Sequence, residues 1–123
     1  MMRKMVETFS TGNLSDADSI IAKGYVDHQG LSADTEIAGS LGFRQVVIMA
    51  RSAYSNLLVE IRDLISEGDR VAVRLRWRGV AAGRQVDRET IDIVRFKQGQ
   101  AVEHWGARLW ISESSDSGVD SPN

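Results

Sequence analysis

The stretch that decides the fold lies near the C-terminus and reads Phe96-Lys97-Gln98-Gly99-Gln100-Ala101-Val102-Glu103-His104-Trp105-Gly106. Gln98-Gly99 is typical of a tight hairpin turn, so we predict two antiparallel strands here, over residues 85–97 and 100–111. The second strand carries Glu103-His104-Trp105, which places a carboxylate, an imidazole and an indole next to one another. This cluster makes the hairpin the first candidate for a functional site.

Two earlier segments, separated by the turn Glu67-Gly68-Asp69, also alternate with the period of a strand. Their apolar sets are Leu57, Val59 and Ile61, then Val71, Val73, Leu75 and Trp77. We expect the second set to face the helices and Arg74, Arg76 and Arg78 to face outward. Outward arginines of an antiparallel sheet usually pair across strands, here with Glu60, Glu89 or Glu103. A clamp on an anionic ligand is the alternative.

The N-terminal half predicts three helices. Apolar residues at helical spacing indicate a helix over residues 1–10, a short helix capped by Ser15 and ending near Gly24, and a third from Ser40 to Tyr54. Residues 25–30 are expected to form a loop or short strand, and residues 30–39 a loop. Three helices followed by a four-stranded antiparallel meander indicate an α+β domain over residues 1–111, with the helices on one face of the sheet.

Residues 112–123 are rich in Ser and Asp and predict a disordered tail. A chain that ends at Ile111 is therefore expected to keep its melting temperature within a few degrees.

The composition is that of a globular domain and excludes several classes of function. The net charge is −2 with both signs interspersed, so the chain has no electrostatic footprint for nucleic acid or an anionic membrane. It has no cysteine, which excludes disulfides and thiolate sites and agrees with the cytoplasmic location that we expect. Neither the two histidines nor any glycine motif has the spacing of a metal or nucleotide site, so we predict no metal and no cofactor.

Two polar residues outside the hairpin turn are candidates for acid/base chemistry. His28 follows Tyr25 and Asp27 where a helix gives way to irregular chain, and it is either a proton carrier or an exposed residue without a role. Asp92 lies in an otherwise apolar strand. We expect it on the outer face against an arginine, with a buried acid as the alternative.

His104 and Trp105 are neighbours in one strand, so they point to opposite faces. Trp105 shares its parity with the apolar residues Ala107 and Leu109. We therefore expect Trp105 inside the domain and His104 outside or at the rim.

The order of these segments resembles that of the SnoaL-like polyketide cyclase family, within the nuclear transport factor two-like superfamily. The resemblance covers about residues 1–111 and rests on Tyr25-Val26-Asp27-His28, Gly42-Phe43, Gly68-Asp69-Arg70-Val71-Ala72-Val73-Arg74, Ile91-Asp92-Ile93-Val94-Arg95-Phe96 and Glu103-His104-Trp105. It implies a curved antiparallel sheet wrapped on three helices, that is, a cone-shaped α+β barrel with an apolar ligand cavity, usually assembled as a homodimer.

The resemblance also implies a function. The chain would be a cofactor-free cyclase or isomerase-like enzyme that uses acid/base, aldol-type chemistry on an apolar, polyketide-like small molecule. His28 is then the first candidate for the general base or acid, with His104 and Asp92 next. The residues expected to bind the substrate are Tyr25, Asp27, Phe43, Tyr54, Trp77 and Trp105.

The chain departs from the family after Trp105. A catalytic aspartate is expected near the His-Trp pair, but Gly106-Ala107-Arg108-Leu109 follows and the next carboxylate is Glu113. This departure supports an alternative function, a non-catalytic small-molecule binding module of the same fold with Trp77 and Trp105 as ligand platforms.

Overall fold

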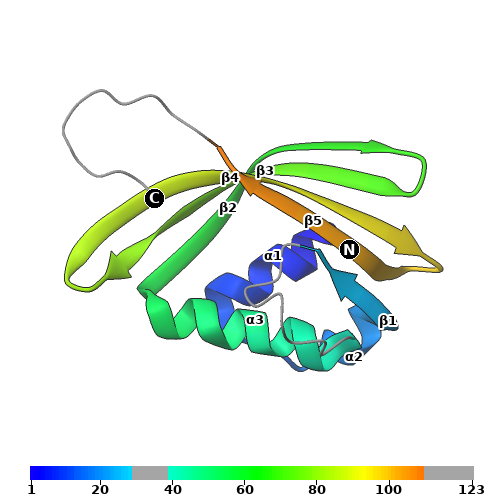
Figure 1. The fold of residues 1–123 in the computed structure, drawn as a ribbon, viewed down its shortest axis with the longest axis horizontal. Coiled ribbons are helices and arrows are strands. Elements are labelled where there is room, and N and C mark those ends of the chain that lie inside the picture. Colours follow the sequence, from blue (N-terminus) through cyan, green and yellow to red (C-terminus); the bar gives the residue numbers. More distant parts are fainter. Residues whose placement is uncertain (29–38, 110–123) are drawn as a thin grey trace.

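The computed structural model describes residues 1–28 and 39–109. Its elements run in the order α1 (Met2–Thr11), α2 (Ala17–Ile20), β1 (Ile21–Asp27), α3 (Gly39–Ala53), β2 (Ser55–Glu67), β3 (Arg70–Ala81), β4 (Arg84–Lys97) and β5 (Gln100–Arg108). Figure 1 shows a curved sheet lying over the helices, so the predicted α+β class is confirmed. Within these residues, no helix is long and apolar enough to cross a membrane. Most of the predicted loop at 30–39, the boundary at Ile111 and the predicted tail lie outside the described residues.

The sheet has five strands in the order β1-β5-β4-β3-β2, rather than the four that we predicted. Strands β2 to β5 form the expected antiparallel meander, and β1 adds a strand parallel to β5. The short helix ends at Ile20 rather than near Gly24, because the following residues pair with the free edge of β5. Ile21 lies opposite Ala101 there, a partner 80 positions away that no local pattern reveals.

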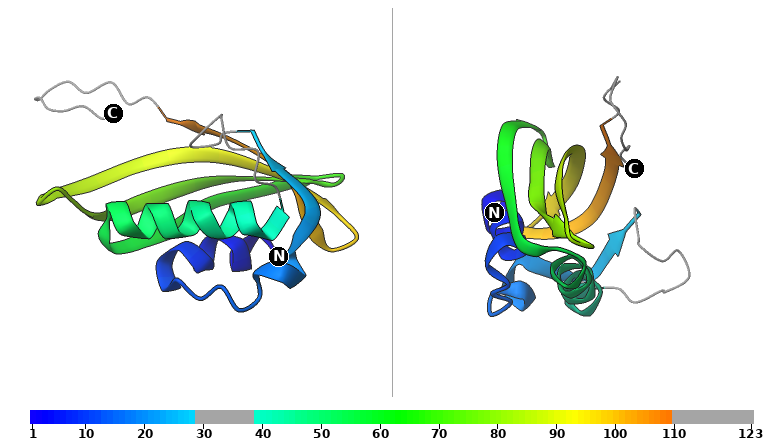
Figure 2. Two further views of the ribbon diagram at one scale, coloured as in Figure 1. Left: turned by 60° about the horizontal axis from the view of Figure 1, so that its bottom comes forward. Right: turned by 90° about the vertical axis from the view of Figure 1, so that its left-hand side faces the viewer.

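The core lies between the helix-facing side of the sheet and the helices. Val73 and Leu75 of β3 are only 2% and 5% exposed, as their alternation predicted, and Phe43 and Val47 of α3 are buried in the same core. Helix α1 packs mainly against β2 and α3 mainly against β1. Figure 2 shows both helices within the curl of the sheet. Burial of each such side chain stabilises the fold by about 1.5–3 kcal/mol.

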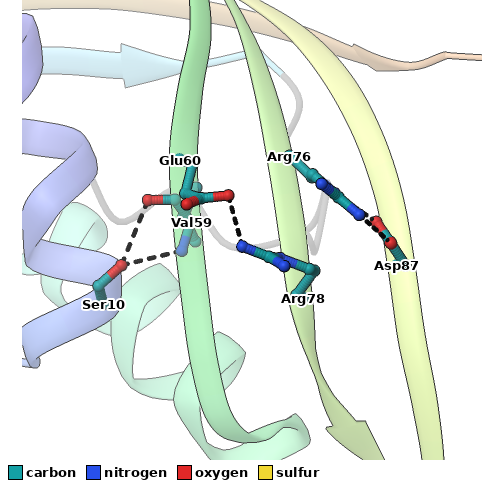
Figure 3. Close-up of polar contacts among 6 residues, drawn as sticks. All are labelled: Ser10, Val59, Glu60, Arg76, Arg78 and Asp87. Carbon is teal, nitrogen blue, oxygen red and sulfur yellow. Dashed lines mark hydrogen bonds and ion pairs between the residues drawn. The ribbon is translucent and has the colours of Figure 1, made fainter.

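The outer face carries arginines that pair with carboxylates, as predicted. The nitrogen–oxygen distances are Arg74–Asp63 2.7 Å, Arg74–Glu89 3.1 Å, Arg76–Asp87 2.6 Å and Arg78–Glu60 2.7 Å. Figure 3 shows the last two pairs crossing between neighbouring strands. Each of these arginines already has a carboxylate partner, which removes support from an anion clamp on this face. Exposed pairs of this kind contribute little to stability individually.

Ser10 of α1 covers the free edge of β2. The backbone N–H of Val59 donates to Oγ of Ser10 at 2.9 Å, and this hydroxyl donates to the carbonyl of Val59 at 3.3 Å (Figure 3). The backbone of an edge strand has no strand on one side, so a side chain that satisfies it also blocks pairing with another chain. This contact fixes α1 against the sheet.

Candidate active site

A β-bulge in β5 decides which side chains enter the domain. Ala101 lies opposite Phe96, but Glu103 lies opposite Arg95, so Val102 is an extra residue in β5. The extra residue reverses the alternation beyond it. His104 therefore faces inward and Trp105 faces outward, which corrects both predicted orientations. The prediction took the apolar residues Ala107 and Leu109 to face inward, but they lie on the outer face with Trp105.

His104 lies between two carboxylates from the strands that flank β5. Its Nδ1 atom is 2.8 Å from Oδ1 of Asp27 on β1, and its Nε2 atom is 2.7 Å from Oδ2 of Asp92 on β4. The side chains of His104, Asp27 and Asp92 are only 14%, 19% and 11% exposed. We call these three residues the Asp–His–Asp cluster. Asp92 thus lies inside the domain, and the predicted outer-face pairing with an arginine is wrong.

The charge state of His104 follows from this geometry. Burial by itself lowers the pKa of the imidazole, but the hydrogen bonds and charges of Asp27 and Asp92 outweigh it and raise the pKa to about 9. At neutral pH the ring is therefore an imidazolium that donates both N–H groups to carboxylates. The described residues bring together no group of three or more His, Asp or Glu side chains suited to a metal ion.

A chain of hydrogen bonds holds Asp92 from its other side. Nε1 of Trp77 donates to Oγ1 of Thr90 at 2.9 Å, and this hydroxyl donates to Oδ1 of Asp92 at 2.7 Å. An indole N–H can only donate, so the Thr90 hydroxyl accepts it and gives its own proton to Asp92. We did not identify Thr90 from the sequence. The signal that finds it is its position two residues before Asp92, on the same face of β4.

Tyr25 places a phenol beside the cluster. The residue is 3% exposed and makes an edge contact with Phe43, with ring centroids 6.3 Å apart. Burial raises the pKa of the phenol, and the charges of Asp27 and Asp92 raise it further, so it stays protonated at neutral pH. Its hydroxyl forms no hydrogen bond with another described residue. This O–H group can therefore donate to an oxygen of a ligand.

His28 does not join the cluster, because it lies on the outer face after the end of β1. Its Nε2 atom is 2.8 Å from Oε2 of Glu103, and its ring stacks on Trp105 with centroids 5.1 Å apart and 13° between the planes. The guanidinium of Arg70 lies over the same indole at 5.3 Å. The two histidines therefore occupy opposite faces of the sheet.

Of the four aromatic residues expected to line one cavity, three share one core and Trp105 lies apart from them. Phe43 is part of the core, and Tyr54 and Trp77 pack against the core while partly exposed. Trp105 lies on the other side of the sheet. The structure does contain a polar pocket of about 140 Å³ at α1 and α2, and none of these four residues lines it.

The chain matches one family model and several solved structures. The model of the SnoaL-like polyketide cyclase family matches residues 1–108, and a search of the curated proteins gives no match. A candidate polyketide cyclase from Bacillus cereus ATCC 10987 is 25% identical, with a TM-score of 0.77, over 87% of this chain and 70% of that chain. IdmH, a candidate polyketide cyclase from Streptomyces antibioticus, is 24% identical, with a TM-score of 0.75, over 87% and 88%.

A SnoaL-like polyketide cyclase from Agrobacterium tumefaciens shares the fold at 14% identity, with a TM-score of 0.75, over 88% of this chain and 87% of that chain. The family model covers every helix and strand from α1 to β5, so the match concerns the whole described domain rather than one motif. The chain belongs to the SnoaL-like polyketide cyclase family.

Proposed function

We propose that the chain is a cofactor-free cyclase that closes a ring by aldol-type acid/base chemistry on an apolar, polyketide-like ketone. The observation that carries this proposal is His104, a buried imidazole bonded at both ring nitrogens to carboxylates from other strands. Family membership supports the class of substrate. Buried clusters of strongly coupled ionisable groups are frequent in active sites, because catalysis needs proton donors and acceptors in fixed positions.

In this proposal Asp92 takes a proton from a carbon next to a carbonyl of the substrate. The oxygen of the resulting enolate accepts a hydrogen bond from the phenol of Tyr25, which is fully protonated at neutral pH. The enolate carbon attacks a second carbonyl of the same molecule, so a carbon–carbon bond forms and a carbon–oxygen π bond breaks. The new alkoxide takes the proton back from Asp92. The proton that Asp92 took from the carbon thus ends on the new hydroxyl group, and His104 holds Asp92 in position throughout.

Asp92 also bears on the absence of a carboxylate after Trp105, where the chain departs from the family. It lies directly opposite Gly106, the residue after the His-Trp pair, where a family carboxylate was expected and not found. A glycine brings no side chain to the inward face here, whereas Asp92 of the neighbouring strand points inward to His104. We propose that this aspartate of β4 takes the role of the carboxylate expected on β5.

The geometry changes the order of the catalytic candidates. His28, the first candidate from the sequence, has a side chain that is 41% exposed and bonded to Glu103 on the outer face. His104 and Asp92 lie on the inward face with Tyr25. We therefore assign the acid/base role to Asp92 and the role of positioning it to His104.

The alternative function, a non-catalytic binding module, was supported by the missing aspartate and expected Trp77 and Trp105 to be platforms for one ligand. The two tryptophans lie on opposite faces of the sheet, which disfavours a shared ligand.

Deuterium exchange into β-tetralone, an apolar bicyclic ketone, tests the proposed proton transfer without the natural substrate. We expect the wild-type protein to accelerate exchange at the carbon next to the carbonyl. Asp92→Asn and His104→Ala should each slow it by about 10²–10⁴-fold, whereas the control His28→Ala should keep the wild-type rate. No acceleration by the wild type, or wild-type rates in both variants, would contradict the proposal.

A further inference from the structure

Arg88 lies on the inward face of the sheet. Its neighbours in β4, Asp87 and Glu89, bond to arginines of the outer face, so the alternation of the strand turns Arg88 toward the helices. Trp77 lies opposite it on β3. The guanidinium lies over the ring of Tyr54, 5.4 Å from its centroid. Arg88 is therefore on the same face as Thr90 and Asp92.

Among the described residues, Arg88 differs from every other half-buried arginine. Each of the others has a carboxylate oxygen within 3.5 Å, and they are Arg44, Arg74, Arg76, Arg78 and Arg95. Arg88 forms no ion pair or hydrogen bond with a described residue, and its Nε atom is buried without a partner. A buried polar group without a partner calls for a specific explanation, because most such groups in proteins are satisfied.

The surroundings of Arg88 disfavour its charge in the free protein. Burial lowers the pKa of Arg88 and the positive charge of Arg108 lowers it further, with Tyr54 acting in the opposite direction. A half-buried cation without a counter-ion is unfavourable until a partner arrives. A guanidinium binds carboxylates through two parallel hydrogen bonds, so a carboxylate of a ligand would satisfy this site.

The distance to the Asp–His–Asp cluster suits a ligand that spans both. Arg88 and Asp92 are four residues apart on one face of β4, which separates their Cα atoms by about 13 Å. Thr90 lies between them on β4, and the indole of Trp77, opposite Arg88 on β3, donates a hydrogen bond to it. A bicyclic or tricyclic acid reaches from one end to the other with its rings beside Trp77.

We propose that Arg88 is an anion-binding residue of the substrate site and that the substrate is a polycyclic ketone bearing a carboxylate. The carboxylate binds Arg88, which places the reacting carbon at the other end, beside Asp92. The identity of the reacting end rests on the proposed cyclase function. The proposal that Arg88 binds the carboxylate does not rest on that function.

Binding of β-naphthoate and of its uncharged methyl ester tests the inference. Heteronuclear NMR of the full chain follows the indole N–H signal of Trp77, which Trp105→Phe and Trp110→Phe variants identify. We expect the wild type to bind the acid at least about tenfold more tightly than the ester, because a charge-assisted pair forms only with the acid. Arg88→Met should remove this preference. The control Arg76→Met, which removes an arginine of the outer face, should keep it.

Arg88→Met should also melt at or above the wild-type temperature, since the change removes an unpaired charge. A loss of acid binding then cannot come from unfolding, and Arg88→Gln provides a second variant with the same expected result. Equal binding of acid and ester by the wild type, or an unchanged preference in both Arg88 variants, overturns the inference. Deuterium exchange by the Asp92 and His104 variants reports separately on the cyclase proposal, so either idea can fail while the other stands.

Discussion

Asp27 and His104 lie 77 positions apart in the chain, and their side chains meet with 2.8 Å between Oδ1 and Nδ1. The contact exists because β1 runs parallel to β5 and places the two residues opposite each other. The backbone repeats the connection, since the N–H of His28 donates to the carbonyl of His104 at 2.8 Å. The Asp–His–Asp cluster therefore also ties β1 to the meander.

Stability should depend on pH through His104. Its pKa is raised from 6.5 to about 9 on folding, so its stabilising contribution is complete below about pH 6.5 and is lost as the pH rises through 9. We expect the free energy of unfolding to fall over this window by an amount on the order of 3 kcal/mol. Urea denaturation at a series of pH values measures it. His104→Gln should flatten the decline and His28→Gln should not; a wild-type stability that is constant from pH 6.5 to 9 would contradict the assignment.

Thr90 should contribute more to the stability of the fold than its small side chain suggests. Thr90→Val removes a hydroxyl that accepts from Trp77 and donates to Asp92, leaving both groups buried without that partner. We expect a loss of about 2–3 kcal/mol in the free energy of unfolding, and recovery of most of it in Thr90→Ser. Thr8→Val is the matched control, because the buried Thr8 hydroxyl donates only to the carbonyl of Lys4 within α1. Equal losses in the free energy of unfolding for Thr90→Val and Thr8→Val would show that the hydrogen bonds from Trp77 through Thr90 to Asp92 add no more stability than the single hydrogen bond of Thr8.

The sequence predicted those parts of the fold that depend on local alternation and turn chemistry. Val73 and Leu75 alternate with arginines in an unbroken strand, so parity gave their faces correctly. Gln98 and Gly99 form the expected turn with φ of 52° and 80°, left-handed conformations that glycine adopts at little cost. The outward arginines form ion pairs with carboxylates, as predicted, because opposite charges on an exposed face pair across neighbouring strands.

The site could not be predicted from the sequence, because three long-range features decide it. The bulge at Val102 exchanges the faces of His104 and Trp105, and nothing around Val102 marks it. The parallel pairing of β1 brings Asp27 to His104 from the other end of the chain. Asp92 faces inward because it lies opposite the buried Val73 of β3, and it meets His104 there instead of an arginine. The faces of His104 and Trp105 were predicted in reverse because Ala107 and Leu109, although apolar, lie on the outer face.

The outer face should also form a homodimer interface, as we propose from one row of residues across four strands. Ile65, Ala72, Ile93 and Trp105 lie directly opposite one another from β2 to β5. Ile65 is 69% exposed, and the arginine–carboxylate pairs lie on the same face. An apolar centre with a charged rim is typical of protein interfaces.

Sedimentation at micromolar concentration tests the dimer. We expect the wild type to be dimeric and Ile93→Glu to be monomeric, because the substitution places a carboxylate at the centre of the apolar row. Ile48→Glu, at an exposed position of α3, should leave the dimer intact. A wild-type protein that sediments as a monomer throughout would remove the dimer proposal and leave the active site untouched.

Whether His104 is a cation at neutral pH decides whether the Asp–His–Asp cluster can work as proposed. A pH titration of the ring nitrogens of His104 by heteronuclear NMR measures this directly in the full-length protein. We predict that both nitrogens carry protons at pH 7.5 and that the ring titrates with an apparent pKa of about 9. A His104 that titrates near its ordinary pKa of 6.5, with one unprotonated nitrogen at pH 7.5, would contradict the imidazolium and the acid/base centre built on it.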